Sequence, residues 1–195
     1  MPRRPRLLTE SGIYHIITRG NNRQALFRKK EDYNRYLDLF RKMKTFHRFE
    51  IYHYCLMKNH AHLLIKFYDE EGLQKVMQRI NLTYAKQYRR AYQHCGHVFQ
   101  DRFKSLPIEK DSYLLECGRY IERNPLKARL VSDPADYHWS SYEVYAFGKS
   151  DDLVSPSPLY TDLANCSQER QRLYREYVLS ERPYEELVEE GLKLF

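Results

Sequence analysis

Two histidines separated by one residue are the first side chains whose spacing could do chemistry. His60 and His62 lie in the run MKNHAHLLI, which has the apolar character of a β-strand. Side chains at positions i and i+2 of a strand project to the same side, so both imidazoles should lie together while Ala61 faces away. Two imidazoles on a rigid strand supply two ligands of a metal site. A pair of this spacing also arises easily among eight histidines, and a structural or surface role is the alternative.

A second pair of polar side chains lies in the run RYIERNP. Tyr120 and Asn124 are four residues apart, so on a helix they share one face. Proline disfavours a helical conformation in the residue before it, and Pro125 therefore predicts that this helix ends at Asn124. A hydroxyl, an amide oxygen and a histidine pair would together make a metal-assisted nucleophilic site. The alternative for Tyr120 is a tyrosine packed in the core.

The other residues of metal-ligating type add nothing by their spacing. The remaining histidines share no ligand spacing with the pair: His15, His47, His53, His94, His97 and His138. The four cysteines are 40, 22 and 49 residues apart and form no C-x-x-C pair. This pattern argues against a zinc ribbon and against a dense disulfide scaffold.

The elements that must position these residues follow from hydrophobic periodicity. Strands are predicted over residues 12–19, 50–57, 60–67 and 98–108. Helices are predicted over residues 31–47, 72–92 and 111–124. The two residues between 57 and 60 give the spacing of a hairpin. The order indicates an α+β sandwich in which helices pack on one face of a mainly antiparallel sheet.

Composition shifts predict the domain boundaries. Residues 1–147 should form the main domain, residues 148–167 a linker that begins rich in Ser, Pro and Asp, and residues 168–195 an acidic, partly helical tail. No apolar run approaches 18 residues, and no hydrophobic signal core follows the basic start of the chain. We therefore expect a cytoplasmic location and no membrane partner.

Positive charge is concentrated in the first part of the chain. The formal net charge is 33 − 26 = +7, of which residues 1–110 carry +13 and residues 111–195 carry −6. Clustered Lys and Arg neutralise phosphates and release counterions, which favours a nucleic-acid partner. The alternative is a solvated basic surface without a ligand. A further hypothesis is that the acidic tail folds back and competes with a polyanion for the basic face.

Several ordered motifs together resemble a known family. They are MKNHAHLL around the histidines, RYIERNPLKARLV around Tyr120, and WSSY at residues 139–142. This set resembles the single-tyrosine HUH transposases, and most closely the REP-associated tyrosine transposases. The runs ITRGNNRQALF and GHVFQDRFKS also resemble that subgroup, so the resemblance covers about residues 10–145.

The resemblance implies a role for each matching residue. His60 and His62 match the histidines of the HUH motif, although Ala61 is small for the position between them. Tyr120 matches the nucleophilic tyrosine, and Asn124 matches the polar residue one turn later that completes a divalent-metal site. The implied fold is a ferredoxin-like, RNA-recognition-type sandwich with the histidines on a central strand. Residues 1–147 would then be the catalytic domain.

The resemblance also implies the reaction and its partners. The enzyme would cleave and rejoin single-stranded or hairpin DNA of the REP type through a 5′-phosphotyrosine, with Mg²⁺ or Mn²⁺ as the cofactor. The protein would be associated with the nucleoid when bound to DNA. Relatives include monomers and dimers that exchange their tyrosine helices, so the oligomeric state stays open.

DNA contacts are expected in the basic part of the chain. The favoured positions are Arg19, Asn21, Asn22, Arg23, Arg89, Arg90, Arg102 and Lys104. Tyr84, Tyr88 and Tyr92 recur every four residues with basic residues between them, a mixture that suits single-stranded nucleic acid, where bases stack and phosphates pair with cations. Core packing is the alternative for this tyrosine stripe, and it is favoured for Tyr84 and Tyr88.

Two other functions fit parts of the pattern. A non-catalytic nucleic-acid-binding module that kept the fold would bind DNA without cleaving it. A metallohydrolase using His60 and His62 on small phosphoesters would not require Tyr120, and the charge of +13 over residues 1–110 disfavours it. Only the transposase hypothesis uses His60, His62, Tyr120 and Asn124 together.

Overall fold

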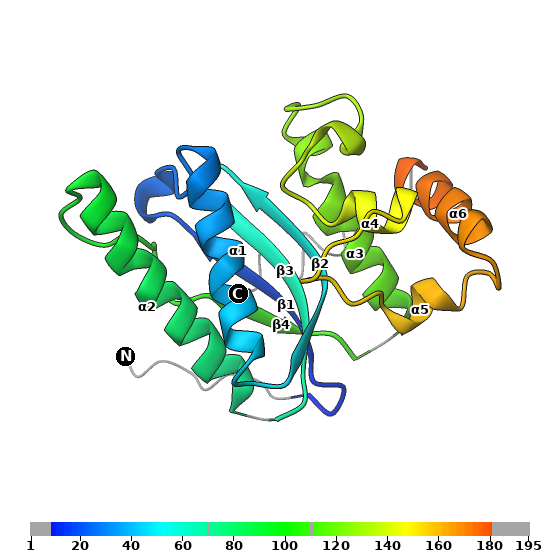
Figure 1. The fold of residues 1–195 in the computed structure, drawn as a ribbon, viewed down its shortest axis with the longest axis horizontal. Helices are drawn as coiled ribbons and strands as arrows, with labels where there is room; N and C mark the ends of the chain where they lie inside the picture. Colours follow the sequence, from blue (N-terminus) through cyan, green and yellow to red (C-terminus); the bar gives the residue numbers. More distant parts are fainter. Residues whose placement is uncertain (1–8, 70, 110, 181–195) are drawn as a thin grey trace.

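One antiparallel sheet forms the centre of the molecule (Figure 1). The computed structural model describes residues 9–69, 71–109 and 111–180. The strands are β1 (Ile13–Arg19), β2 (Phe49–Met57), β3 (His60–Phe67) and β4 (Lys104–Pro107). Their spatial order is β2-β3-β1-β4, and every neighbouring pair is antiparallel. The predicted hairpin of β2 and β3 is confirmed, and the histidines of β3 lie on a central strand.

Helices α1 (Lys30–Lys44) and α2 (Gly72–Tyr92) cover one face of this sheet. Alternate strand residues, such as Ile16 and Leu63, are fully buried in the same apolar cluster as these helices. Asp32 satisfies backbone donors at the start of α1, because its carboxylate accepts hydrogen bonds from the N–H groups of Arg28 and Lys29 at 2.9 and 3.2 Å. The predicted amphipathic helices are therefore present, and α2 has the predicted ends.

Helix α3 (Asp111–Lys127) lies on the opposite face, mainly over β2. A second apolar cluster joins Cys55 and Leu64 of the sheet to Leu114 and Ile121 of this helix. The α+β class with an antiparallel sheet is confirmed, but helices cover both faces of the sheet and not one. The reason is visible in β2, where every residue after position 50 is buried, so both faces of the strand need cover.

The end of α3 differs from the prediction, since the helix continues through Pro125 to Lys127. Proline has no N–H to donate to the carbonyl four residues earlier. The side-chain amide of Asn124 donates to the backbone carbonyls of Tyr120 and Ile121 at 2.9 and 3.2 Å. Asn124 thus supplies a donor to the Ile121 carbonyl that Pro125 leaves without its helical partner, and the helix continues for three residues beyond Asn124.

The remaining elements gather around α3. They are the 3₁₀ turn η2 (Pro134–Asp136) and helices α4 (Tyr142–Phe147), α5 (Pro158–Thr161) and α6 (Ser167–Leu179). The sequence predicts a linker over 148–167, but in the structure Leu153 is fully buried and Val154 forms a bridge with Ile51 of β2. Tyr174 and Val178 of α6 are also fully buried. Apolar residues spread thinly through a polar segment are enough to hold it against the domain, and residues 181–195 of the expected tail lie outside the described residues.

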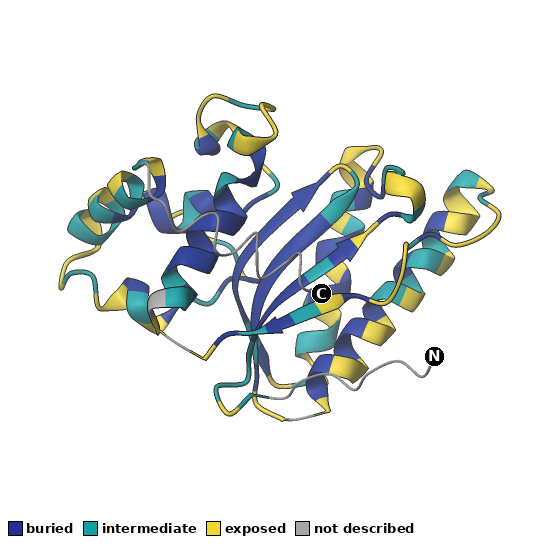
Figure 2. Cartoon of the chain, turned by 180° about the vertical axis from the view of Figure 1, so that it is seen from behind, coloured by how far each residue is buried: buried dark blue, intermediate teal, exposed yellow. Residues whose placement is uncertain are grey.

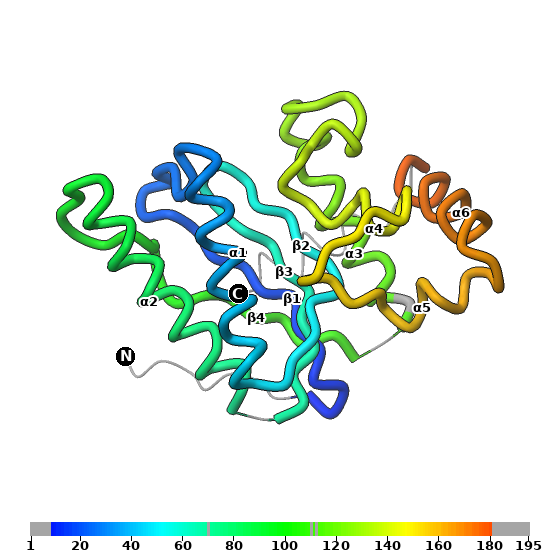
Figure 3. Tube along the Cα trace, viewed as in Figure 1, coloured from blue at the N-terminus to red at the C-terminus, as the bar shows by residue number. Residues whose placement is uncertain are grey.

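Burial follows this layered arrangement (Figure 2). Strands β1, β2 and β3 are buried over most of their length, whereas the outer surfaces of the helices are exposed. Figure 3 traces the chain from α3 through a loop back to α4, beside α5 and α6. None of the helices within the described ranges is long and apolar enough to cross a bilayer.

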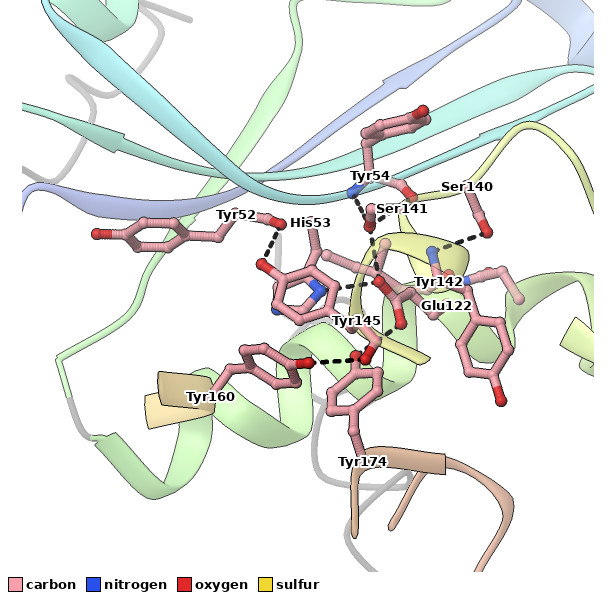
Figure 4. A network of polar contacts seen from close by, with 12 residues as sticks. Tyr52, His53, Tyr54, Glu122, Ser140, Ser141, Tyr142, Tyr145, Tyr160 and Tyr174 are labelled. Atoms are coloured by element: carbon pink, nitrogen blue, oxygen red, sulfur yellow. Dashed lines mark hydrogen bonds and ion pairs between the residues drawn. The ribbon is translucent and has the colours of Figure 1, made fainter. Parts of the chain in front are cut away.

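A buried carboxylate fixes α3 to the sheet and to the elements that follow it (Figure 4). Glu122 has no exposed surface, and its carboxylate accepts hydrogen bonds from Ser141 Oγ and Tyr174 Oη, both at 2.6 Å. His53 Nδ1 of β2 lies 2.9 Å from the same carboxylate. One side chain of α3 therefore holds β2, the start of α4 and α6 together.

Two arginines of α3 add a second connection to α6. Arg119 is fully buried, and its guanidinium donates to the backbone carbonyls of Tyr177, at 2.9 Å, and Ser180. Arg123 donates to the carbonyl of Val178 at 2.5 Å. These carbonyls belong to the last turn of α6 and to Ser180 directly after it, where backbone acceptors lack helical partners and cations are favourable. Residues on both sides of Tyr120 are thus anchored to α6.

Gly118 is required where α3 passes His53. A Cβ atom at this position would lie 2.6 Å from His53 Nε2. The His53 ring is fixed, because it stacks on Tyr145 with ring centroids 4.2 Å apart and is bonded to Glu122. We predict that Gly118→Ala lowers the free energy of unfolding by about 1–3 kcal/mol, measured by urea denaturation, because overpacking shifts α3.

The control for this prediction is the same substitution made beside a smaller neighbour. In a His53→Ala background the clash is absent, and Gly118→Ala should be neutral or stabilising, since alanine favours helix. An equal loss of stability in both backgrounds would contradict the proposed clash.

Candidate active site

The two histidines open β3 directly after the hairpin turn, in a row of basic residues across the sheet. The strand register sets Arg19 of β1 opposite His60 and Ile17 opposite His62. Lys104 of β4 lies opposite Ile17 on the other side of β1. Residues directly opposite in antiparallel strands share a face, so the histidines, Arg19 and Lys104 are on the same face. The predicted side-by-side arrangement of His60 and His62 is present, with their ring centroids 5.0 Å apart.

A cavity of about 350 Å³ opens over this row of residues. Its lining residues are Ile17, Arg19, His60, His62, Gln100, Asp101, Arg102 and Lys104. Three cations that the sequence nominated for DNA contacts therefore surround the histidine pair. The cavity has the charge and the donors to hold a phosphate.

Both histidines of the pair are held in their neutral form. Burial lowers the pKa of His60 to about 4, and the neighbouring Arg19 guanidinium contributes to the shift. Burial also holds the pKa of His62 well below its usual value, with smaller effects from nearby imidazoles and cations. A neutral imidazole is the form that binds metal ions, so neither side chain has to lose a proton near pH 7 to act as a ligand.

Helix α3 brings Tyr120 to the histidines within one chain. The Tyr120 ring makes edge contacts with His62 and with His15 of β1, at centroid distances of 5.8 and 5.9 Å. Tyr120 is buried and belongs to the apolar cluster beneath α3. It is not among the residues that line the cavity described above.

Lys127, which the sequence motifs did not identify as a site residue, lies over the ring of Tyr120. Lys127 Nζ is 4.7 Å from the centroid of the Tyr120 ring. The two residues are seven apart, two turns along the same face of α3, which is a spacing that could have identified Lys127. Its positive charge also contributes to the lowered pKa of His62.

Asn124 lies one helical turn after Tyr120 and is buried. Because its amide nitrogen donates to two backbone carbonyls of α3, the orientation of the side chain is fixed. Among the described residues no three His, Cys, Asp or Glu side chains are arranged to hold a metal ion, so a site at His60 and His62 needs another kind of ligand. An amide oxygen is a ligand of this kind by its chemistry, and two imidazoles with one amide oxygen suit a divalent cation that keeps open positions.

The other predicted DNA contacts lie around the site but not all within it. Arg89 and Arg102 line a second cavity, of about 530 Å³, between α2 and the segment 97–103. Asn21, Asn22 and Arg23 form the short 3₁₀ turn η1 (Asn21–Arg23) that follows β1, and they line neither cavity. Arg90 is exposed on α2 and also lies outside both.

The tyrosine stripe on α2 is mostly core. Tyr84 and Tyr88 are buried, and their hydroxyls donate to the backbone carbonyls of Leu26 and Ala25 at 2.7 and 2.8 Å. Tyr92 is partly exposed, but it bonds the carboxylate of Asp32 at 2.5 Å. The rings of Tyr84 and Tyr88 are therefore not available to stack on bases, and the core-packing alternative holds for these two residues.

His15 contacts His62 in the structure, although no spacing along the chain connects it to the pair of His60 and His62. Its Nε2 lies 3.0 Å from Nδ1 of His62, and both rings are almost completely buried. The contact crosses from β1 to β3, so it depends on which strands are neighbours. Alternation in the strand 12–19 gives the face of His15, but only the sheet order brings His15 to His62.

The comparisons with known proteins agree with this fold. The family model described as "Transposase IS200 like" matches residues 9–124, and the chain belongs to this transposase family. No curated protein matches. A solved structure of a REP-associated tyrosine transposase bound to a REP hairpin is 20% identical, with a TM-score of 0.64, and the match covers 80% of this chain and 96% of that one.

A second solved structure, of a candidate transposase from Deinococcus radiodurans R1, is 17% identical. Its TM-score is 0.43, and the match covers 63% of this chain and 97% of that one. The structural match to the REP-associated transposase covers 80% of this chain, which is more than the residues 9–124 that the family model matches.

Proposed function

We propose that this protein is a metal-dependent DNA transposase that cleaves and rejoins single-stranded DNA through a covalent bond to Tyr120. The contact between the Tyr120 and His62 rings, at 5.8 Å, carries the proposal. It brings a nucleophile and a metal-ligating pair together from positions 58 residues apart, within a single chain. Basic residues Arg19, Arg102 and Lys104 surround the same histidines, as a phosphodiester substrate requires.

In the proposed reaction, Tyr120 Oη attacks the phosphorus atom of a phosphodiester. A bond forms between Oη and phosphorus while the bond from phosphorus to O3′ breaks, which leaves a 5′-phosphotyrosine and a 3′-hydroxyl. The proton lost by the phenol is balanced by the proton that the leaving 3′ oxygen takes up. The phosphodiester energy is retained in the intermediate, so a 3′-hydroxyl can reverse the step and join strands without ATP.

The side chains around Tyr120 support this chemistry. A phenol has a reference pKa of about 10, so its deprotonation needs help near pH 7. The ammonium of Lys127, 4.7 Å from the ring, favours the negative charge that develops on the phenol. His60, His62 and Asn124 would hold Mg²⁺ or Mn²⁺, and a bound cation would neutralise charge on the phosphate in the transition state.

The cavity beside the active site supports binding of an unpaired nucleotide. It adjoins the histidine cavity, because Gln100, Asp101 and Arg102 line both. Gln74, Gln78 and other amide side chains in its wall can bond base edges, and Phe99 offers a ring for stacking. A REP-type hairpin with a single-stranded flank is the proposed substrate, as in the structurally similar transposase.

The proposed function is tested by incubating the protein with end-labelled hairpin DNA that carries a single-stranded flank. With Mn²⁺ present we predict cleavage and a protein–DNA adduct that survives denaturing electrophoresis. Addition of EDTA should abolish both while leaving hairpin binding largely unchanged, because most phosphate contacts of a bound hairpin would come from Arg and Lys side chains, and the metal would contact only the phosphate that is cleaved. Binding without cleavage in any divalent metal would reject the proposal in favour of a non-catalytic nucleic-acid-binding module.

A further inference from the structure

Each histidine of the site is hydrogen-bonded at the same ring nitrogen. His62 Nδ1 lies 3.0 Å from Nε2 of His15, and His60 Nδ1 lies 2.6 Å from Oδ1 of Asn59. His15 and His62 are exposed by 1% and 4%, so water does not compete for their bond. The two partners come from different places, since His15 is on β1 and Asn59 is in the hairpin turn before β3. In both His60 and His62 the bonded nitrogen is Nδ1, so these partners do not contact Nε2.

The bond from Asn59 fixes the position of the proton on His60. The amide nitrogen of Asn59 donates to the carbonyl of Arg23 at 3.2 Å, which turns its oxygen toward His60. An amide oxygen only accepts hydrogen bonds, so His60 must donate from Nδ1. In a neutral imidazole the other nitrogen then carries a lone pair. Nε2 of His60 is therefore ready to bind a metal ion.

The bond between His15 and His62 has two possible arrangements, because each neutral ring has one donor and one acceptor. If His15 donates, the proton of His62 is on Nε2 and that nitrogen cannot be a ligand. If His62 donates from Nδ1, its Nε2 carries the lone pair. Only the second arrangement gives His62 the same tautomer as His60.

We infer that His15 and Asn59 are positioning residues that hold His62 and His60 as Nδ1–H tautomers, with both Nε2 atoms free for one divalent cation. That His60 and His62 form a metal site rests on the proposed function. The positions of the protons on their rings do not depend on it. Outer partners of this kind fix the tautomer and the ring orientation of metal-binding histidines and increase their basicity.

The positions of the protons can be measured in the metal-free protein. Nitrogen-15 NMR of histidine-labelled wild type distinguishes a protonated from an unprotonated ring nitrogen, and His60→Ala and His62→Ala variants assign the signals of the two residues. We expect Nδ1 to be protonated and Nε2 unprotonated in both His60 and His62. A proton on Nε2 of His62 would overturn the inference, whatever the activity of the protein.

Metal affinity is the second measurement, made with Mn²⁺ and without DNA by electron paramagnetic resonance titration. His15→Leu should weaken Mn²⁺ binding by about ten- to a hundredfold, and His15→Gln, whose side-chain oxygen can accept from His62, should restore most of it. Asn59→Ala and Asn59→Asp form the matching pair for His60. Exposed His138 is the control, and His138→Leu should bind Mn²⁺ like wild type.

The outcomes separate this inference from the proposed function. A folded His15→Leu variant with wild-type Mn²⁺ affinity would overturn the role of His15. Absence of Mn²⁺ binding in wild type would instead reject the metal site, while the NMR signals would still decide the tautomers. If His15→Leu does not fold, the wild-type spectrum and the His15→Gln titration decide the question.

Discussion

Tyr120→Phe is expected to abolish the covalent adduct and to reduce cleavage by about 10³-fold or more, because the substitution removes the nucleophilic oxygen. The Tyr120 ring packs in the cluster between α3 and the sheet and contacts His15 and His62. Phenylalanine keeps that ring, so the fold and the affinity for hairpin DNA should be unchanged. Adduct formation is measured by denaturing electrophoresis with end-labelled DNA and Mn²⁺, and binding by a mobility shift in EDTA.

Tyr113 supplies the matched control, since it lies on the same helix and packs against the same cluster. Tyr113→Phe removes a hydroxyl from α3 without touching the histidines. It should form the adduct at the wild-type rate. Equal adduct formation by Tyr120→Phe and wild type would show that another residue is the nucleophile.

Glu122→Ala is expected to produce the largest loss of stability, about 3–5 kcal/mol, because it leaves several buried partners of the carboxylate unpaired. His53, Ser141 and Tyr174 all lose their acceptor (Figure 4). Urea denaturation followed by circular dichroism measures the free energy of unfolding. Adduct formation should also fall at temperatures where the variant is still folded, because Glu122 holds the helix that carries Tyr120.

Two further variants separate the buried network from the charge of the residue. Glu122→Gln keeps an acceptor for His53 and Ser141, so it should lose only about 1 kcal/mol. Glu143 pairs with Lys149 at the surface of α4, and Glu143→Ala should change stability by no more than about 0.5 kcal/mol. If Glu122→Ala lowered the free energy of unfolding no more than Glu143→Ala does, the hydrogen bonds of Glu122 would not be what anchors α3.

The parts of the site that follow from local periodicity could be predicted from the sequence. The alternation of His60, Ala61 and His62 on a strand gives the side-by-side imidazoles. The four-residue spacing of Tyr120 and Asn124 gives their shared helical face. Whether the two pairs meet depends on where α3 crosses the sheet, which local periodicity does not determine. The placement of Tyr120 beside the histidines is instead implied by the resemblance of the motifs to the single-tyrosine transposases.

The parts that could not be predicted depend on contacts between distant residues. His15 meets His62 only because β1 and β3 are neighbours in the sheet. The helix passes Pro125 because the Asn124 amide bonds the carbonyl of Ile121. Leu153 and Val154 are isolated apolar residues in a polar segment, and their burial depends on β2 having space beside it. None of these contacts leaves a periodic signal.

Trapping the adduct and locating it by mass spectrometry tests the central claim most directly. The protein is incubated with Mn²⁺ and hairpin DNA, denatured and digested with trypsin, which cleaves after Arg119 and Arg123. We predict that the peptide of residues 120–123 carries the mass of a 5′-phosphorylated DNA end on Tyr120. A DNA end attached to any other residue, or cleavage without an attached peptide, would contradict the assignment of Tyr120 as the nucleophile.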